Sequence, residues 1–234
     1  MANKLIIAYL FTLTLAGLIA MGVSFFNQLA CEGQPINNNV LPTFSQQIMG
    51  EQILSQSFIA PRPGLNRIDI LFQTYQRQNT HDVTLRLLEV PSGVDNPLQG
   101  VELFKATFNA ADVSDEIWRT FRFAPIPDSA GKTYLTTFQS PESVNGNAIT
   151  VGGIERDVYR PGSAFLGPVP VPADITFRVC FQMSTFEKLQ VLAEQMTRNR
   201  PALWADPIFY GVALMAYLLL LIAFFWQLSK LALR

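Results

Sequence analysis

The sequence predicts a mainly β protein, an antiparallel β-sandwich or jelly roll flanked by an N-terminal and a C-terminal transmembrane helix. Two uncharged apolar stretches lie near the ends of the 234-residue chain, and many short segments of alternating polarity lie between them. Such alternation is typical of strands with one buried and one wet face, and no room remains for the crossover helices of a parallel sheet. We divide the chain into a first membrane helix, an outer β domain, an amphipathic helix, and a second membrane helix with its tail, at residues 1–26, 27–183, 184–200 and 201–234.

The first apolar stretch, Leu5 to Phe26, contains 22 residues and no charge. A helix of this length covers about 33 Å, which exceeds a hydrocarbon core of about 30 Å. A cleaved signal peptide is one alternative, although its apolar region usually has only about 7–15 residues. The sequence "QLAC", residues 28–31, suggests a second alternative, which is a lipidated Cys31. However, Gln28 stands where a lipoprotein cleavage site has an aliphatic residue. We expect a retained membrane helix.

The second apolar stretch, Pro207 to Trp226, contains 20 uncharged residues. Asp206 is a suitable N-cap, and Pro207 is a favourable first helical residue. Aromatic residues at both ends fit the two membrane–water interfaces: Trp204, Tyr210 and Trp226. The stretch therefore predicts a second membrane helix.

The positions of the basic residues predict the membrane topology. Lys4 precedes the first helix, and no Lys or Arg follows that helix until Arg62. Lys230 and Arg234 follow the second helix, but Arg198 and Arg200 precede it, so the second helix alone is ambiguous and the first helix decides. We therefore expect both termini on the cytoplasmic side of the inner membrane, with residues 27–206 outside.

The outer part, residues 27–206, carries all 18 acidic residues and 14 of the 17 basic residues, a formal charge of −4. This balance excludes the basic surface that is typical of nucleic-acid binding. Cys31 and Cys180 also lie there, and an exported compartment permits a disulfide between them. Two unpaired thiols are the alternative.

Eight segments of the outer part are predicted as strands. Four alternate clearly, at residues 67–75, 82–90, 118–126 and 174–183, and four more are expected at 52–59, 101–108, 133–140 and 147–152. The alternation places Ile68 and Ile70 in the core, whereas it places Asp69 and Cys180 on the wet face. The sequence "GPVPVP", residues 167–172, is predicted as a stiff linker.

Residues 184–200 predict an amphipathic helix, with Ser184 and Glu187 as a capping box and a stop before Pro201. Its apolar stripe is a candidate partner-binding surface: Phe186, Leu189, Ala193 and Met196. Three alternatives stay open for this stripe, which are packing on the sandwich, lying on the membrane surface, and docking on a partner subunit. Small residues on the first membrane helix form a second candidate, because they permit close helix packing: Ala16, Gly17 and Ala20.

The stretch "DSAGKTY", residues 128–134, ends like a phosphate-binding P-loop. However, Ile126 stands where the motif requires its first glycine, and the following "TYLTTFQS" is typical of a strand. We therefore expect a turn and no nucleotide site. His81 is the only histidine, and the two cysteines form no cluster with metal-ligand spacing. We predict no catalytic, cofactor-binding or metal-binding residues, and no enzyme.

The segment "WRTFRFAPIPDSAGKTYLTTFQSPES" resembles a pattern in membrane-anchored β-sandwich domains of Chloroflexi-type bacterial membrane proteins, above all at "FRFAPIPDSAGKTY". The resemblance covers roughly Gln52 to Met183. It implies a jelly-roll domain similar to carbohydrate-binding modules, and it implies scaffolding or binding instead of catalysis. Related domains accompany multi-pass glycosyltransferase-like proteins, but this chain has only two predicted spans and no catalytic membrane domain.

These observations favour a non-catalytic accessory or scaffolding subunit of a larger integral membrane complex, with the bilayer and other integral membrane subunits as partners. The Chloroflexi resemblance points to an electron-transfer or photosynthetic assembly. The alternative is a carbohydrate- or envelope-binding module with aromatic residues on one sheet face: Trp118, Tyr134 and Tyr159. Packing in the core is the other role that these aromatic residues commonly have.

Overall fold

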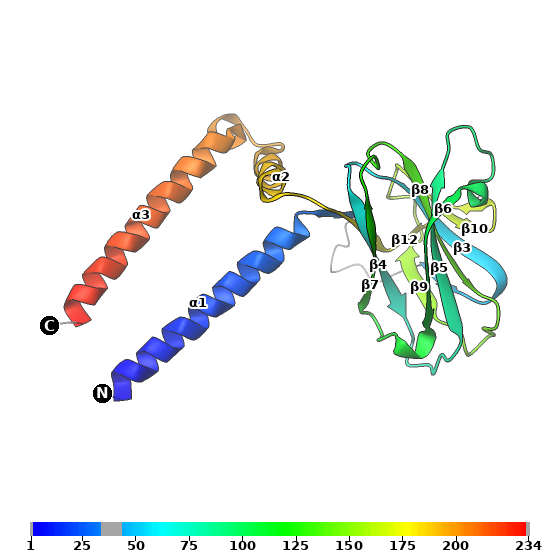
Figure 1. The fold of residues 1–234 in the computed structure, drawn as a ribbon, viewed down its shortest axis with the longest axis horizontal. Coiled ribbons are helices and arrows are strands. Elements are labelled where there is room, and N and C mark those ends of the chain that lie inside the picture. Colours follow the sequence, from blue (N-terminus) through cyan, green and yellow to red (C-terminus); the bar gives the residue numbers. More distant parts are fainter. Residues whose placement is uncertain (1, 34–43, 233–234) are drawn as a thin grey trace. The chain divides into compact units, whose positions relative to one another are not determined.

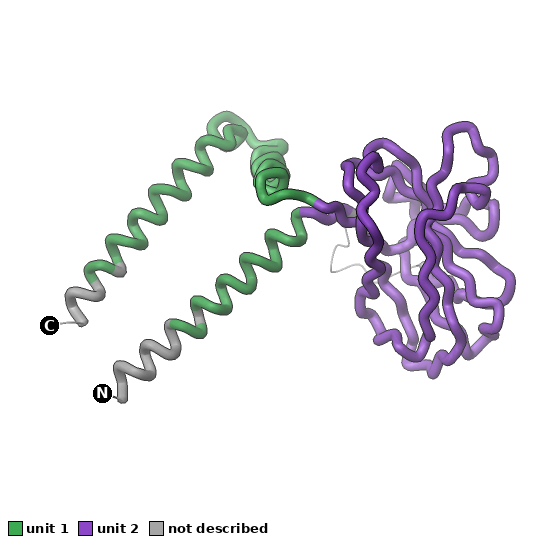
Figure 2. Tube along the Cα trace, in the orientation of Figure 1, with its two compact units in different colours: residues 1–29, 183–234 green, residues 30–182 purple. Residues whose placement is uncertain are grey.

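The computed structural model describes residues 2–33 and 44–232, and its described side chains exclude those of 2–11, 14, 33, 44, 225 and 228–232. Figure 2 shows two compact units, residues 1–29 with 183–234 and residues 30–182. The first unit is helical and the second is a β-sandwich, and each is described by itself.

The β unit consists of two sheets that face each other (Figure 1), and every strand pair between described residues is antiparallel. The seven-stranded sheet has the order β1 (Cys31–Gly33), β13 (Phe177–Phe181), β4 (Leu65–Gln73), β9 (Thr150–Ile154) and β12 (Asp174–Ile175), with β2 (Phe44–Gln47) on β9 and β7 (Trp118–Ile126) on β4. The six-stranded sheet has the order β11 (Val169–Val171), β10 (Ala164–Leu166), β3 (Gly50–Ile59), β8 (Thr133–Ser140), β5 (Asp82–Val90) and β6 (Val101–Asn109). The predicted antiparallel sandwich is confirmed, whereas the finer assignment as a jelly roll stays a prediction.

The core lies between the two sheets and consists of the inward positions of the alternating strands. Ile68 and Ile70 of β4 are fully buried, as predicted. Phe58 of β3 stacks on Tyr134 of β8, and its ring centroid lies 5.6 Å from that of Phe177 in the opposite sheet. Burial of each such side chain contributes about 1.5–3 kcal/mol, so the aromatic contacts join the two sheets firmly.

Two residues that were expected on the wet face are buried. Asp69 is 0% exposed and Cys180 is 4% exposed. Both side chains lie on the outward face of their strands, as the alternation predicted. They are nevertheless covered by other side chains, so the prediction that they contact solvent was wrong. Arg67 and Arg178 bind Asp69, and Cys180 is bonded to Cys31 of the neighbouring strand β1.

The predicted strand at residues 174–183 is two strands. β12 pairs with β9, whereas β13 pairs with β4, because the chain changes partners at Thr176. The predicted stiff linker at residues 167–172 is also wrong, since β11 forms a hairpin with β10 there. Pro170 is tolerated because β11 is an edge strand, where a missing backbone donor faces no neighbour.

The "DSAGKTY" stretch forms a turn that leads into β8, so the predicted turn and the strand after it are confirmed. Ser129 is fully buried, and its hydroxyl accepts from the Leu65 amide at 3.1 Å and donates to the Arg62 carbonyl at 2.8 Å. Gly131 has a φ of +75°, a conformation that favours glycine, and its amide donates to the Ala60 carbonyl at 2.8 Å. The turn therefore holds the neighbouring β3–β4 connection in place.

The helical unit contains α1 (Ala2–Gln28), α2 (Thr185–Thr197), the 3₁₀ helix η3 (Ala202–Ala205) and α3 (Pro207–Ala232). The predicted capping box is confirmed, because the Glu187 amide donates to Ser184 Oγ at 3.3 Å and the Ser184 amide donates to Glu187 Oε2 at 2.6 Å. Asp206 Oδ1 accepts from the Ile208 amide at 2.8 Å, as an N-cap does.

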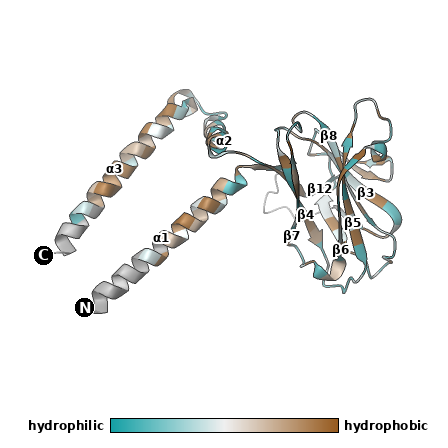
Figure 3. Cartoon of the chain, viewed as in Figure 1, coloured by the Kyte–Doolittle hydropathy of each residue, from teal (hydrophilic) through white to brown (hydrophobic). Residues whose placement is uncertain are grey.

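One helix of the described chain is long and apolar enough to cross a membrane, with its apolar window at Pro207–Phe224 (Figure 3). The expected first span, Leu5 to Phe26, falls within α1, but the side chains of its residues 5–11 and 14 lie outside the described part of the structure. The described apolar stretch of α1 is Leu15–Gln28, which is shorter than a full span.

Candidate functional site

The chain enters the sandwich through β1 and leaves it through β13, and these strands are hydrogen-bonded neighbours. We name β1 and β13 the terminal strand pair. Cys31 and Cys180 are register partners and form a disulfide across it. The Phe181 amide also donates to the Ala30 carbonyl at 2.9 Å. Cys31 is therefore not a free lipidation site, and the two ends of the sandwich are held together.

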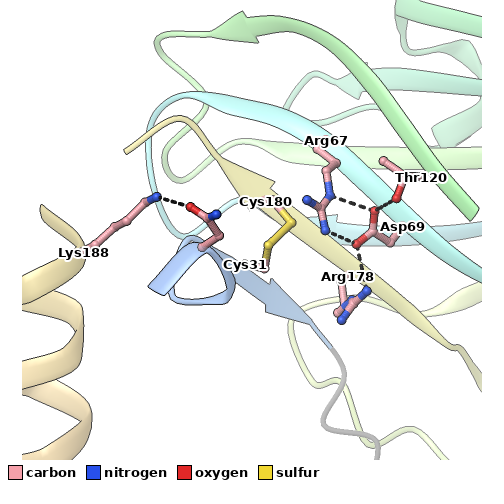
Figure 4. The surroundings of a disulfide bond; sticks show 8 residues. Cys31, Arg67, Asp69, Thr120, Arg178, Cys180 and Lys188 are labelled. Atoms are coloured by element: carbon pink, nitrogen blue, oxygen red, sulfur yellow. Dashed lines mark hydrogen bonds and ion pairs between the residues drawn. A yellow bond between two sulfur atoms is a disulfide. The ribbon is translucent and has the colours of Figure 1, made fainter. Parts of the chain in front are cut away.

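A buried charged cluster lies next to this disulfide on the outer face of the same sheet (Figure 4). Asp69 Oδ1 accepts from Arg67 Nε at 2.8 Å and from Thr120 Oγ1 at 2.8 Å. Asp69 Oδ2 accepts from Arg67 Nη2 at 2.6 Å and lies 3.1 Å from Arg178 Nη2. Two guanidinium groups thus compensate the charge of a carboxylate that no water reaches, as a buried ion requires.

The register explains this cluster, because Arg178 and Thr120 are the cross-strand partners of Asp69 on its two neighbouring strands. Arg67 lies two residues earlier on the same strand and hence on the same face. Trp118 lies beside them, with the Arg178 guanidinium carbon 4.2 Å from its ring centroid. This cation–π contact covers part of the Trp118 ring, one of the three aromatic candidates for glycan binding.

Tyr134, another of those candidates, belongs to the core and does not face solvent, being 0% exposed. The glycan-binding assignment of Tyr134 was therefore wrong, because its position on β8 points toward Phe58 and the opposite sheet. Its hydroxyl has no hydrogen-bond partner among the described residues. Burial, with a smaller contribution from Glu89, raises the pKa of Tyr134 to about 12.

We predict that Tyr134→Phe leaves the stability of the sandwich unchanged or raises it by up to about 1 kcal/mol, since it removes a buried hydroxyl without a partner. Urea denaturation followed by fluorescence measures this change. Tyr159→Phe is the matched control, because the Tyr159 hydroxyl donates to the Ile59 carbonyl at 3.4 Å and its removal should not stabilise the fold. A clear loss of stability in Tyr134→Phe would show that its hydroxyl has a partner.

Tyr159 lines a cavity of about 370 Å³ within the β unit. The cavity is mostly apolar, and its walls come from both sheets and from the segment between β9 and β10: Glu32, Ile59, Pro61, Tyr159, Pro161, Phe177 and Val179. Glu32 is paired with Arg62, whose Nε lies 2.7 Å from Glu32 Oε1. The ring of Tyr159 packs edge-on against Phe177 with centroids 5.2 Å apart. This cavity can accommodate a small apolar group more readily than a sugar.

A buried carboxylate fixes the segment that carries Tyr159. Asp174 Oδ2 accepts from the Val158 amide at 2.7 Å and from the Tyr159 amide at 2.8 Å. Asp174 Oδ1 accepts from Gln56 Nε2 at 3.1 Å, and Gln56 Oε1 accepts from the Ile175 amide at 2.8 Å. Burial raises the pKa of Asp174 despite these hydrogen bonds, since the charged form loses its hydration.

The raised pKa of Asp174 predicts how the stability depends on pH. The folded protein keeps this proton at pH values where the unfolded chain has released it, so the contribution of Asp174 to stability falls as pH rises from about 4 through the folded pKa. Asp174→Asn abolishes that dependence. The difference in unfolding free energy between wild type and Asp174→Asn, measured from pH 4 to 7, should therefore shift against the wild type as pH rises. A difference independent of pH would contradict this assignment.

The candidate contact residues of the helical unit lie on α1 and α2 and are largely uncovered. Ala16, Gly17 and Ala20 of α1 are exposed, and among the described residues no atom beyond the local helix backbone lies within 4 Å of a Cβ added at Gly17. The stripe of α2 is also largely uncovered, with Phe186, Leu189 and Met196 exposed and Ala193 half-buried. Val191, which is not part of the predicted stripe, is the buried residue of α2.

Within the described residues, no group of three or more His, Cys, Asp or Glu side chains is arranged to hold a metal ion. Sequence reasoning missed the Asp69 cluster, the Gln56–Asp174 link and the cavity, because each joins residues from strands that are distant in sequence. The isolated polar residue Asp69 between Ile68 and Ile70 carried no signal of its burial.

No protein-family model matches the chain, and no curated protein matches it. Solved structures of infectious bursal disease virus match over most of the chain. The crystal structure of the VP2 subviral particle shares 14% identity with a TM-score of 0.25, covering 82% of this chain and 48% of that chain. The structure of the Gt strain shares 9% identity with a TM-score of 0.18, covering 80% and 51%. The chain thus spans about half the length of these proteins, and TM-scores this low carry no argument about fold or function.

Proposed function

We propose that this chain is a two-pass membrane protein, with both termini cytoplasmic and the β-sandwich outside, that serves as a non-catalytic accessory or scaffolding subunit of a larger integral membrane complex. One observation carries the proposal: the terminal strand pair, locked by the Cys31–Cys180 disulfide, joins the two ends of the sandwich. The chain therefore enters and leaves the sandwich on two paired strands, β1 and β13.

This arrangement suits an outer domain with two anchors. A chain that leaves the membrane through α1 and returns through α3 needs the two ends of its outer domain close together, and the pairing of β1 with β13 supports this. The basic residues near both termini support cytoplasmic ends: Lys4, Lys230 and Arg234. The oxidised cysteine pair is in keeping with an exported compartment.

The exposed small residues of α1 support contact with a neighbouring membrane helix. Ala16, Gly17 and Ala20 share one side of the helix, where a partner backbone can approach closely. An electron-transfer or photosynthetic assembly is the proposed kind of complex, and this part of the proposal depends on the Chloroflexi resemblance alone.

Purification of the full chain from its native membrane in a mild detergent, followed by mass spectrometry of co-purifying proteins, tests the proposal. We expect integral membrane proteins to co-purify with the wild type and to be lost from Gly17→Leu. Gly22→Leu is the matched control, because Gly22 is equally open but lies on the opposite side of α1. A wild type that is monodisperse and without companions would refute the role as a subunit.

The alternative, an envelope-binding module, is favoured by the cavity beside Tyr159. Binding of envelope lipids or glycans that is abolished by Tyr159→Ala and preserved by Tyr75→Ala, a change at an exposed tyrosine elsewhere in the sandwich, would support it. If the protein binds neither envelope lipids nor glycans, the accessory role is the better explanation.

A further inference from the structure

The apolar stripe of α2 is uncovered. Phe186, Leu189 and Met196 are 68%, 49% and 37% exposed, and they recur at helical spacing on one side of α2. Val191, which is 3% exposed, lies on the opposite side of the helix. A narrow line of α2 is therefore buried, whereas its broader apolar side is open.

Contacts within the helical unit place α2 beside the last turn of α1 and the start of α3. Lys188, in the first half of α2, donates through Nζ to Asn27 Oδ1 at 3.1 Å and lies 5.5 Å from the ring centroid of Phe26. At the other end, the hydroxyl of Tyr210 in α3 donates to the Met196 carbonyl at 3.3 Å. Because the end of α1 and the start of α3 are the outer ends of the two proposed spans, α2 lies at the level of the membrane surface.

The residues that follow α2 suit the same level. Arg198 and Arg200 are exposed, and η3 exposes Leu203 and Trp204. Trp204 also packs against Phe209 of α3, with centroids 5.0 Å apart. Tryptophan prefers the headgroup region of a bilayer, and arginine near that surface binds anionic phosphates.

We propose that α2 and residues 198–204 bind the outer surface of the phospholipid bilayer, with Phe186, Leu189 and Met196 in the acyl-chain boundary and the two arginines at the lipid phosphates. The proposal rests on the proposed anchoring through α3. Lipid is the occupant because the open stripe lies at the start of α3, whose apolar window is 0% buried by the rest of the chain. The Met196 end of the stripe lies against the start of α3, so both can contact the same bilayer surface.

Nitroxide accessibility in the full chain tests this inference, since all cysteines of the described chain are in the disulfide and one added cysteine can be labelled alone. Leu189→Cys reports the stripe, and Gln195→Cys on the polar side of α2 is its control. The proteins are reconstituted in vesicles of phosphatidylcholine with phosphatidylglycerol. We expect the ratio of oxygen to nickel-chelate accessibility to be several-fold higher at Leu189→Cys than at Gln195→Cys.

A third label, Leu219→Cys in α3, separates the two proposals. If Leu219→Cys is accessible to oxygen but Leu189→Cys is as accessible to the chelate as Gln195→Cys, then α3 spans and the inference about α2 is wrong. If Leu219→Cys is also accessible to the chelate, the anchoring itself is wrong. A Leu189→Cys label shielded from both reagents would show a protein partner on the stripe and overturn the lipid assignment.

The double variant Arg198→Gln with Arg200→Gln should lower the accessibility ratio at Leu189→Cys in these vesicles. An unchanged ratio would show that the two arginines do not contribute to the proposed lipid contact.

Discussion

Replacement of Cys31 and Cys180 by alanine should lower the free energy of unfolding of the sandwich by roughly 3–5 kcal/mol. The disulfide joins residues 149 positions apart. The chain-entropy relation gives about 5 kcal/mol for a loop of this length, and removal of a native disulfide typically costs about 2–5 kcal/mol. The loss should be large because β1 has only three residues and the disulfide holds it against β13.

Urea denaturation of the full chain in detergent measures this loss, with Trp118 as the reporter after Trp204→Phe and Trp226→Phe. Reduction of the wild type with dithiothreitol is an independent control, and it should shift the denaturation midpoint in the same direction. If neither treatment moves the midpoint, the bridge does not constrain the unfolded chain and the prediction is wrong.

Asp69→Ala should destabilise the sandwich by roughly 2–4 kcal/mol. The substitution removes the acceptor of Thr120 and leaves Arg67 and Arg178 close together without a compensating carboxylate. Breaking a buried ion pair costs about 3–5 kcal/mol, and we expect somewhat less because both arginines are partly exposed and regain water.

Two comparisons sharpen the Asp69 experiment. Asp128→Ala removes an exposed carboxylate from its ion pair with Lys132, and we expect little change in the urea midpoint. Joint replacement of Asp69, Arg67 and Arg178 by leucine and methionine should restore most of the lost stability, because no unpaired charge remains. If Asp69→Ala and Asp128→Ala behave alike, the cluster does not stabilise the fold.

The long strands were predictable because their alternation is local. In β4, the polar residue Asp69 separates Ile68 from Ile70, and both isoleucines are buried. The short strands were not predictable, since β12 has two residues and β1 has three, too few for any period to be read. Each short strand pairs with a strand edge that the other strands leave unpaired, and which edges these are depends on the whole fold.

Features of the candidate site were likewise predictable only where they depend on residues close together in the sequence. The capping box at Ser184 and Glu187 depends on residues three positions apart, so the sequence sufficed to predict it. The environment of Asp69 depends on three strands in register, and that of Tyr134 on Phe58 of the neighbouring strand β3. Neither environment leaves a mark in the neighbouring sequence.

The disulfide across β1 and β13 also determines how the protein transmits force. A pull on the two helices reaches the sandwich only at Cys31 and Cys180, which are covalently joined. Tension therefore passes through the sulfur–sulfur bond and bypasses the residues between the two cysteines, which form the two sheets and the core. In the proposed membrane complex, movement of the bilayer or of neighbouring subunits would leave the sandwich unstretched, and chemical reduction of the bond would expose its hydrogen-bonded strands to mechanical unfolding.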